Sequence, residues 1–365
     1  MVTISHKSYW ILGICASLAL GMVLAVYFGG NVSTVESEAL PLNYSRPLEE
    51  KLADPQISLI AVGDVMLSRV VGSKIKKYGD YRHPLLKTAD LLKSADLTFG
   101  NLESPITPGR EILTGEMAFR ADPEVTEGLT YAGFDVLTLA NNHILNFGRQ
   151  GLEDTFKYLK EAKINFIGVG ETAIDANRPL IKEAQGVKFA LLGYSYTDSG
   201  SPLVAPMDAV KMEEAVKQAK EQADFVIVTM HDGTEYQFIP NKHQKEFAHQ
   251  AIEAGAALVI GHHPHVVQTV EEYQGGYIIY SLGNFVFDQM WSQETREGMV
   301  AKVIFQKEGI TEMKFYPVVI EDYSQPRFAA DSESERIVAR LDMKLEYETS
   351  GQFPNYKFQI SNNNQ

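Results

Sequence analysis

Possible metal ligands follow five separate short apolar segments of this chain, and this pattern restricts the fold more than any other feature. From Ile57 onward, apolar runs of strand length alternate with segments of helical periodicity, which is typical of a layered α/β fold. Ligands of open α/β sheets bind beyond the carboxyl ends of the strands, so polar side chains that follow the strands are expected to meet there. The residues in question are Asp64, Glu103, Asn142-His143, His231 and His263-Pro264-His265.

The apolar and helical periods predict the following elements. The predicted strands are Ile57–Val62, Leu97–Phe99, Val136–Leu139, Phe166–Val169, Lys188–Tyr194, Phe225–Met230, Ala257–Ile260, Val267–Tyr273, Gly276–Ser281, Val300–Gln306 and Ile310–Pro317. The predicted helices are Pro84–Ser94, Glu124–Ala132, Gly148–Ala162, Asp208–Gln222, Lys242–Ala254 and Glu333–Tyr347. One α/β domain is therefore expected over residues 55–321, followed by a C-terminal tail, residues 322–365, that carries a single helix.

An uncharged apolar run, Tyr9–Phe28, precedes the domain. At helical rise it spans about 30 Å, the thickness of a bilayer core. Lys7 precedes the run and no Lys or Arg follows until Arg46, so the positive-inside rule places residues 1–8 in the cytoplasm and the domain outside a bacterial-type cell membrane. Polar residues 29–54 are expected to form a tether. A cleaved signal peptide is the alternative, although its apolar region is usually shorter.

The charge of the chain limits its partners. The net charge is −14, which argues against nucleic acid or an anionic lipid surface as the main partner. An anionic substrate remains compatible, because a bound metal ion can outweigh a diffuse acidic surface. The one cysteine, Cys15, lies within the apolar run and excludes both an intrachain disulfide and a thiolate metal site.

The polar residues at the strand ends form a consistent set of metal ligands. Five of the nine histidines, namely His143, His231, His262, His263 and His265, lie in these segments. Carboxylate, imidazole and amide oxygen suit Zn, Mn or Fe. A two-metal site needs a carboxylate that bridges ions about 3.5–4 Å apart, and Glu103 is the candidate. Since His263 and His265 alternate along an extended segment, a turn or bulge must bring both rings to the ions.

Each of these residues also has an ordinary structural interpretation. Asp64 could cap a turn, and Glu103 could be an exposed loop acid. Asn142 could occupy a left-handed turn position, and His143 could be a packed histidine. His262 is interpreted as a supporting or packed residue rather than a ligand.

Four further residues are candidates for contact with a substrate. Arg69 and Arg120 could bind a carboxylate or phosphate bidentately, with an ordinary salt bridge as the alternative. Glu235 could line the pocket or only pack its loop. Asn284 could support the site or form a structural turn.

Six motifs resemble those of CapA-type capsule (poly-γ-glutamate) synthesis proteins, within the calcineurin-like metallophosphoesterase superfamily. The resemblance covers about Ile57 to Asp288, and the motifs are specific only when taken together. It implies a four-layer α/β/β/α sandwich. The motifs are Gly63-Asp64-Val65-Met66-Leu67-Ser68-Arg69, Gly100-Asn101-Leu102-Glu103, Ala140-Asn141-Asn142-His143, His231-Asp232-Gly233-Thr234-Glu235-Tyr236, Gly261-His262-His263-Pro264-His265 and Ser281-Leu282-Gly283-Asn284-Phe285.

The resemblance also implies roles for these residues. Asp64 and His265 would bind one of two divalent ions, Glu103 would bridge them, and His143 would be the non-ligand histidine that protonates a leaving group or stabilises developing charge. The residues implied for the other ion are Asn142, His231 and His263. The first motif of the superfamily is usually Asp-x-His, where this chain has Asp64-Val65-Met66, and the bridging acid is usually Asp rather than Glu.

Two functions are compatible with these features. The first is a membrane-anchored, metal-dependent hydrolase that acts in synthesis, export or anchoring of an anionic capsular polymer, together with other membrane-bound capsule-synthesis proteins. The second is a non-catalytic, polymer-handling component of such a complex. The full set of proposed ligands favours the first, and Met66 favours the second.

Overall fold

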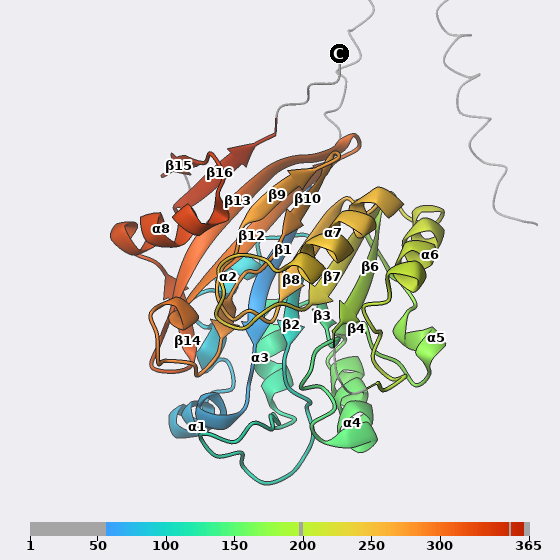
Figure 1. Ribbon diagram of the computed structural model, residues 1–365. Coiled ribbons are helices and arrows are strands. Elements are labelled where there is room, and N and C mark those ends of the chain that lie inside the picture. The colour runs from blue at the N-terminus through green and yellow to red at the C-terminus, as the bar shows by residue number, and fades with distance from the viewer. Residues whose placement is uncertain (1–55, 197–199, 350–351, 361–365) are drawn as a thin grey trace, which may run out of the picture. The chain divides into compact units, whose positions relative to one another are not determined.

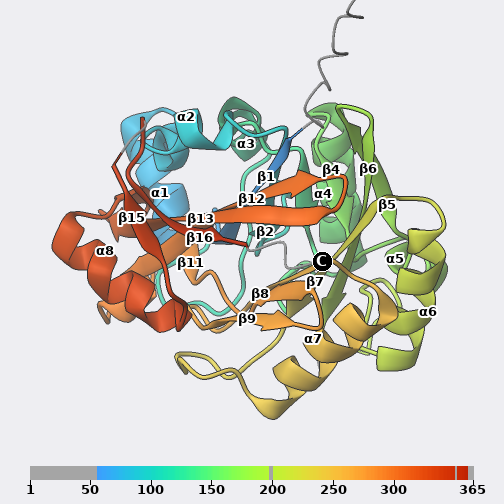
Figure 2. The same cartoon turned by 90° about the horizontal axis from the view of Figure 1, so that it is seen from above.

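The computed structural model describes residues 56–196, 200–349 and 352–360. These residues belong to the second of the two units of the chain, Ala53–Gln365, and Figures 1 and 2 show their arrangement. The predicted anchor, Tyr9–Phe28, and the predicted tether, residues 29–54, lie outside them. Within the described ranges, every helix is too short or too polar to span a bilayer.

The first of two β-sheets has β1 near its middle and runs in the order β15-β16-β13-β12-β1-β2-β3-β4, with β11 paired to β1 and β14 paired to β13. Strands β1 to β4 are parallel, whereas β12 is antiparallel to β1. The bounds are β1 Ile57–Val65, β2 Leu97–Leu102, β3 Val136–Thr138, β4 Asn165–Ile167, β11 Asn284–Val286, β12 Glu297–Gln306, β13 Gly309–Glu321, β14 Gln325–Phe328, β15 Glu346–Glu348 and β16 Asn355–Gln359.

The second sheet runs in the order β5-β6-β7-β8-β10-β9. Its central strands β6, β7, β8 and β10 are parallel. The bounds are β5 Leu180–Ala184, β6 Val187–Ser195, β7 Phe225–His231, β8 Leu258–His262, β9 Val270–Tyr273 and β10 Gly276–Ile279.

Three apolar cores show how the sheets and helices pack. One core combines side chains of both sheets, such as Leu59 of β1 and Ile227 of β7, so the sheets pack face to face. The other two lie on the outer faces, under α1 to α4 and under α6 and α7, and Figure 2 shows these helix groups on opposite sides. The helices are α1 Arg69–Tyr78, α2 Ala89–Leu92, α3 Val125–Ala132, α4 Gly148–Glu161, α5 Ala173–Ala176, α6 Ala209–Lys220, α7 Lys242–Ala254 and α8 Asp331–Val338, with 3-10 turns η1 His83–Leu85, η2 Glu294–Arg296 and η3 Ala339–Leu341.

The structure confirms a mixed α/β fold with two sheets and corrects several predicted elements. The segment Pro84–Ser94 is not one helix but η1 followed by α2. The helix predicted over Glu333–Tyr347 ends by Leu341, because Asp342 adopts a left-handed backbone with φ 53°. The chain then forms β15 and β16, which extend the first sheet beyond β13.

Helix α1 was missed by sequence reasoning. Its buried Val71 and Ile75 are four residues apart, a spacing that indicates one face of a helix. The intervening Lys and Ser residues hid this short pattern.

The residue before Asp64 permits a close approach of two backbones. A Cβ on Gly63 would lie 1.9 Å from the carbonyl oxygen of Gly283, so a larger residue cannot occupy this position without a shift of the main chain. The amide of Asp64 donates a 3.0 Å hydrogen bond to the same oxygen. This contact fixes the end of β1 against the segment that leads into β11.

Candidate metal centre

Two fully buried carboxylates lie at the carboxyl ends of neighbouring strands. Asp64 lies at the end of β1, Glu103 directly follows β2, and both are 0% exposed. Strand pairing places Asp64 between Asn101 of β2 and Asn284 of β11. The carboxylates are therefore brought together by sheet register, as the strand-end pattern predicted.

Three histidines from the second sheet face these carboxylates. His231 ends β7, and the ring centroid of His263 lies 4.8 Å from that of His231 and 6.0 Å from that of His265. In His265, Nδ1 lies 3.3 Å from Oδ2 of Asp64 and Nε2 lies 3.8 Å from Oε1 of Glu103. His263 and His265 have φ values of 99° and 58°, which residues with a Cβ rarely adopt. This left-handed backbone turns the two alternate rings toward one site.

Asn101 is a site residue that sequence reasoning missed. Its Nδ2 lies 2.8 Å from Oδ1 of Asp64, 3.1 Å from Oε2 of Glu103 and 3.4 Å from Nδ1 of His231. Side chains two apart on a strand share a face, so the spacing of residues 101 and 103 was the available signal. Rotation of the Asn101 amide by half a turn would put Oδ1 where Nδ2 now lies, facing Asp64 and Glu103. An amide oxygen in that position can bind a metal ion.

His143 lies beside the cluster. Its Nε2 is 4.0 Å from Oε1 of Glu103, and its Nδ1 is 3.0 Å from Oδ1 of Asn146. The ring stacks on Phe119 with centroids 3.8 Å apart. The neighbouring Asn142 is exposed, and its Oδ1 lies 3.0 Å from Nε2 of His231.

The pKa values of these groups diverge because they share a buried space. Burial and the charge of Asp64 raise the pKa of Glu103 well above its usual range. For Asp64 itself burial would raise the pKa, but the imidazoles of His262 and His265 outweigh it and hold the pKa well below its usual range. Burial lowers the pKa of His143 to about 4. For His265 burial would lower the pKa, but Glu103 and Asp64 raise it to about 9.

Several buried polar atoms at this edge have no hydrogen-bond partner among the described residues. They are Oε1 of Glu103, both ring nitrogens of His262 and Nδ1 of His263. Nδ1 of His262 is 3.2 Å from Oδ1 of Asp64 but is not aligned for a hydrogen bond. Buried polar atoms are normally paired, so this concentration requires a further partner.

The donor atoms fit a divalent cation as that partner. Ligand atoms of Asp64, Glu103 and His265 all lie within 4.8 Å of one another, and so do those of Glu235, His263 and His265. Carboxylate oxygen and imidazole nitrogen are ligands that Zn, Mn and Fe accept. The residues present therefore fit the metal centre that the sequence predicted.

The two candidate arginines are already bonded within the protein. Arg69 pairs with Asp288, donates to the carbonyl oxygen of Glu116 at 3.2 Å and lies 4.6 Å from the Phe119 ring centroid. Arg120 is 4% exposed and donates to two carbonyl oxygens and to Asp122. Arg120 thus braces its loop, whereas Arg69 lies next to the stacking partner of His143.

Asn284 supports one of the histidines. Its Oδ1 lies 2.9 Å from Nδ1 of His265, and its amide group donates to Gln289 and to the carbonyl oxygen of Thr295. The amide oxygen is therefore held toward the ring, which orients His265.

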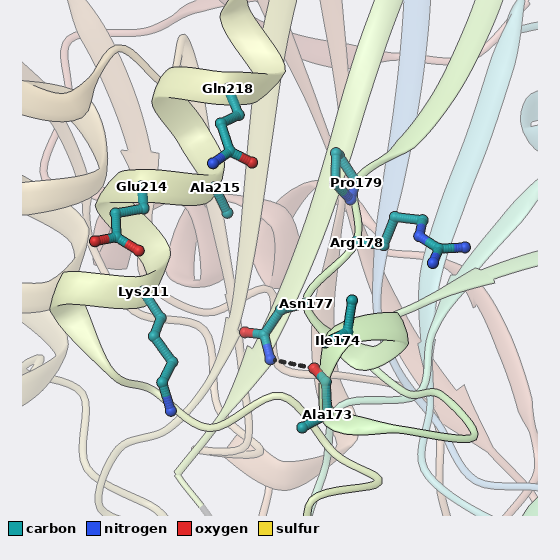
Figure 3. A pocket seen from close by; sticks show the side chains of 9 residues that line it. All are labelled: Ala173, Ile174, Asn177, Arg178, Pro179, Lys211, Glu214, Ala215 and Gln218. Atoms are coloured by element: carbon teal, nitrogen blue, oxygen red, sulfur yellow. Dashed lines mark hydrogen bonds between the residues drawn. The ribbon is translucent and has the colours of Figure 1, made fainter.

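A separate hollow of about 430 Å³ lies between α5 and α6 (Figure 3). On one side of the hollow, the side chain of Asn177 donates a 2.8 Å hydrogen bond to the carbonyl oxygen of Ala173 within α5. It is lined by Ala173, Ile174, Asn177, Arg178, Pro179, Lys211, Glu214, Ala215 and Gln218, none of which belongs to the candidate metal centre.

The two-sheet α/β fold is consistent with the metallophosphoesterase-like class of folds. A solved structure described as a novel phosphatase from Mycoplasma pneumoniae superposes with a TM-score of 0.52 and 15% identity, over 74% of this chain and 95% of that one. At this identity the likeness concerns the fold alone.

The sequence comparison is more specific. The model of the family "Bacterial capsule synthesis protein PGA_cap" matches residues 58–289. The capsule biosynthesis protein CapA of Bacillus anthracis is 32% identical in an alignment of 306 residues, which covers 78% of this chain and 73% of that protein. The PGA biosynthesis protein CapA of Bacillus subtilis is 30% identical and is covered to 80% in both chains. This chain belongs to the PGA_cap family of bacterial capsule synthesis proteins.

Proposed function

We propose that the protein is a membrane-anchored, metal-dependent hydrolase that acts in synthesis, export or anchoring of an anionic capsular polymer such as poly-γ-glutamate. The biological role is supported by the two CapA relatives, whose names refer to capsule and PGA biosynthesis. The chemistry is supported by one observation: Asp64, Glu103 and His265 converge in a buried space where polar atoms lack partners among the residues described.

The residues of the site have distinct roles in this proposal. Divalent ions bound there would lower the pKa of water to about 7 and neutralise developing negative charge. Glu103 would help to hold the ions, because its ligand atom lies within 4.8 Å of those of Asp64 and His265. His143 donates its Nδ1–H to Asn146, so its Nε2 is the atom at which a proton is held or moved.

A hollow beside this centre is large enough for part of a polymer. It measures about 420 Å³, and its lining includes Arg69, Asp288 and Trp291. Arg69 connects it to the centre, because the guanidinium packs on Phe119, which stacks on His143. We assign this hollow to the substrate segment next to the bond that is cleaved.

Metal content and a substrate screen test the proposal. The full-length chain, purified in detergent and supplied with Mn or Zn, should contain two ions and hydrolyse a phosphoester or an anionic polymer. Replacing both His231 and His263 by Ala should remove at least one ion and lower the melting temperature in metal-replete buffer, since bound metal stabilises the folded state. Unchanged metal content in the double variant would remove this site from consideration.

Met66 supports a second function, a non-catalytic component that handles the polymer. Met66 is 0% exposed, and its sulfur accepts a 3.1 Å hydrogen bond from the amide of Ser68, so the side chain is part of the core. If the protein binds two ions but hydrolyses nothing in the screen, this second function becomes the better conclusion.

Membrane anchoring and assembly with other membrane-bound capsule-synthesis proteins are further parts of the proposal. The uncharged run Tyr9–Phe28 after Lys7 supports the anchor. The names of the two CapA relatives, which refer to capsule and PGA biosynthesis, support the assembly. Protease added to intact spheroplasts should digest the domain, and a domain that stays protected would contradict the orientation. Crosslinking in the native membrane should recover the partner proteins.

A further inference from the structure

The loop that follows β7 brings a third acid to the histidines of the centre. Glu235 has an oxygen within 4.8 Å of a ring nitrogen of His263 and of His265. This group shares only His265 with the group that contains Asp64 and Glu103. The strand-end pattern could not assign Glu235, because it lies four residues beyond the end of β7.

Backbone contacts hold this loop against the segment that carries the two histidines. The amide of Tyr236 donates a 2.8 Å hydrogen bond to the carbonyl oxygen of Pro264, between His263 and His265. Tyr236 has a left-handed backbone with φ 64°, and its hydroxyl accepts a 3.3 Å hydrogen bond from Gln289. A Cβ on Gly233 would lie 2.8 Å from Cγ of Pro264, so the loop also packs closely at its start. The position of Glu235 therefore follows from a main-chain hydrogen bond just after it and from close packing on Pro264 just before it.

In the part of the chain that the structure describes, the carboxylate of Glu235 is not paired with a lysine or arginine side chain, because none lies within 4.0 Å of it. Its nearest ligand-type neighbours are the rings of His263 and His265, and Nδ1 of His263 is buried without a hydrogen-bond partner in the same part of the chain. An acid beside two imidazoles, one with an unpaired nitrogen, matches the donor types of a cation site.

We propose that Glu235 is a ligand of the metal centre and binds the ion that His263 also holds. This inference rests on the metal-dependent function proposed above. Together with Asp64 and Glu103, Glu235 supplies three negative charges to two divalent ions, so the net charge of the centre is +1. Without Glu235 the net charge would be +2. Additional carboxylate favours a hard ion such as Mn over Zn.

The test is a metal titration of full-length variants in detergent. Glu235→Gln keeps the size of the side chain and removes its charge, and residue 235 is not buried, so the variant should fold. We expect the affinity for one of two Mn ions to fall by more than about tenfold in calorimetry. The matched control is Glu246→Gln on α7, an exposed acid that pairs with Lys242 and should leave both affinities unchanged. Melting temperatures in EDTA check that both variants are folded.

The outcomes separate this inference from the proposed function. Two ions in the wild type, with one weakened only by Glu235→Gln, support both. Two ions bound with wild-type affinities by Glu235→Gln overturn the role of Glu235 and leave the proposed function standing. A wild type that binds no Mn or Zn overturns both.

Discussion

Two buried glutamates of this protein have opposite surroundings. Glu297 of β12 is 1% exposed and accepts hydrogen bonds from Arg336, Arg340 and Gln293. Glu103 is 0% exposed, yet the described residues give it one amide donor, Asn101, and leave Oε1 without a partner. Burial and the charge of Asp64 raise its pKa, and His265, whose Nε2 lies 3.8 Å from Oε1, opposes them.

The difference shows that burial alone does not make a charged residue functional. Glu297 joins α8 and η3 to the first sheet, so its charge is balanced by the protein itself. For Glu103, burial and the charge of Asp64 oppose ionisation and His265 partly offsets them, so a bound cation would complete the charge balance. The following experiments test whether Glu103 is needed for metal binding and Glu297 for the stability of the fold.

The largest effect is expected for Glu103→Gln. Loss of this carboxylate should weaken metal binding by more than about 100-fold, since even residues behind the ligands contribute 10–100-fold. Turnover should fall to background. The metal-free variant should melt no lower than the wild type, because repulsion with Asp64 is relieved. A calorimetric titration that matches the wild type would contradict the role of Glu103.

His143→Ala should reduce turnover and leave metal binding intact. A positioned proton donor or acceptor contributes about 10²–10⁴ in rate, and His143 approaches Glu103 only to 4.0 Å. Metal content should stay at the wild-type value. Full turnover on a substrate that the wild type hydrolyses would refute the catalytic role, whereas loss of metal would make His143 a ligand.

Glu297→Gln should show the reverse pattern. The substitution removes the negative charge that pairs with Arg340, whose side chain is only 13% exposed. Breaking a buried ion pair lowers the free energy of unfolding by about 3 kcal/mol. We take the lower end of the usual range because the Arg336 side chain is 42% exposed and can return to water. Urea unfolding in EDTA measures the loss, and metal affinity should not change. A variant as stable as the wild type would show that the pair contributes nothing.

The smallest effect is the pH dependence of metal binding. In the metal-free protein Glu103 and Asp64 raise the pKa of His265 from 6.5 to about 9 against the opposing effect of burial, so an ion must displace a proton. Affinity should therefore rise at most about tenfold per pH unit and level off above about pH 9. The contribution of His265 to the stability of the metal-free protein has the opposite pH dependence. It is complete below pH 6.5 and is lost as the pH rises through about 9. Affinity that does not depend on pH would exclude His265 as a ligand.

Much of the site could be predicted because strand ends are local features. The apolar run Ile57–Val62 and the Gly-Asp after it indicate a strand that ends at Asp64, whatever the rest of the chain does. Asn101 was missed although strand alternation places it beside Glu103. The structure brings Arg69 close to the site and engages Arg120 elsewhere, and nothing in their sequence neighbourhoods distinguishes the two.

The sequence by itself determined the chemistry available at the carboxyl ends of the strands, since hydrophobic period and residue type are local properties. Only the tertiary structure decided which of these groups meet. Asp64 reaches His265 across 201 positions of sequence through sheet packing, and the two histidines turn inward because His263 and His265 adopt left-handed backbones. Glu235 joins them through one hydrogen bond from Tyr236 to Pro264. Long-range pairing and backbone conformation of this kind depend on the whole fold, so no local pattern reveals them.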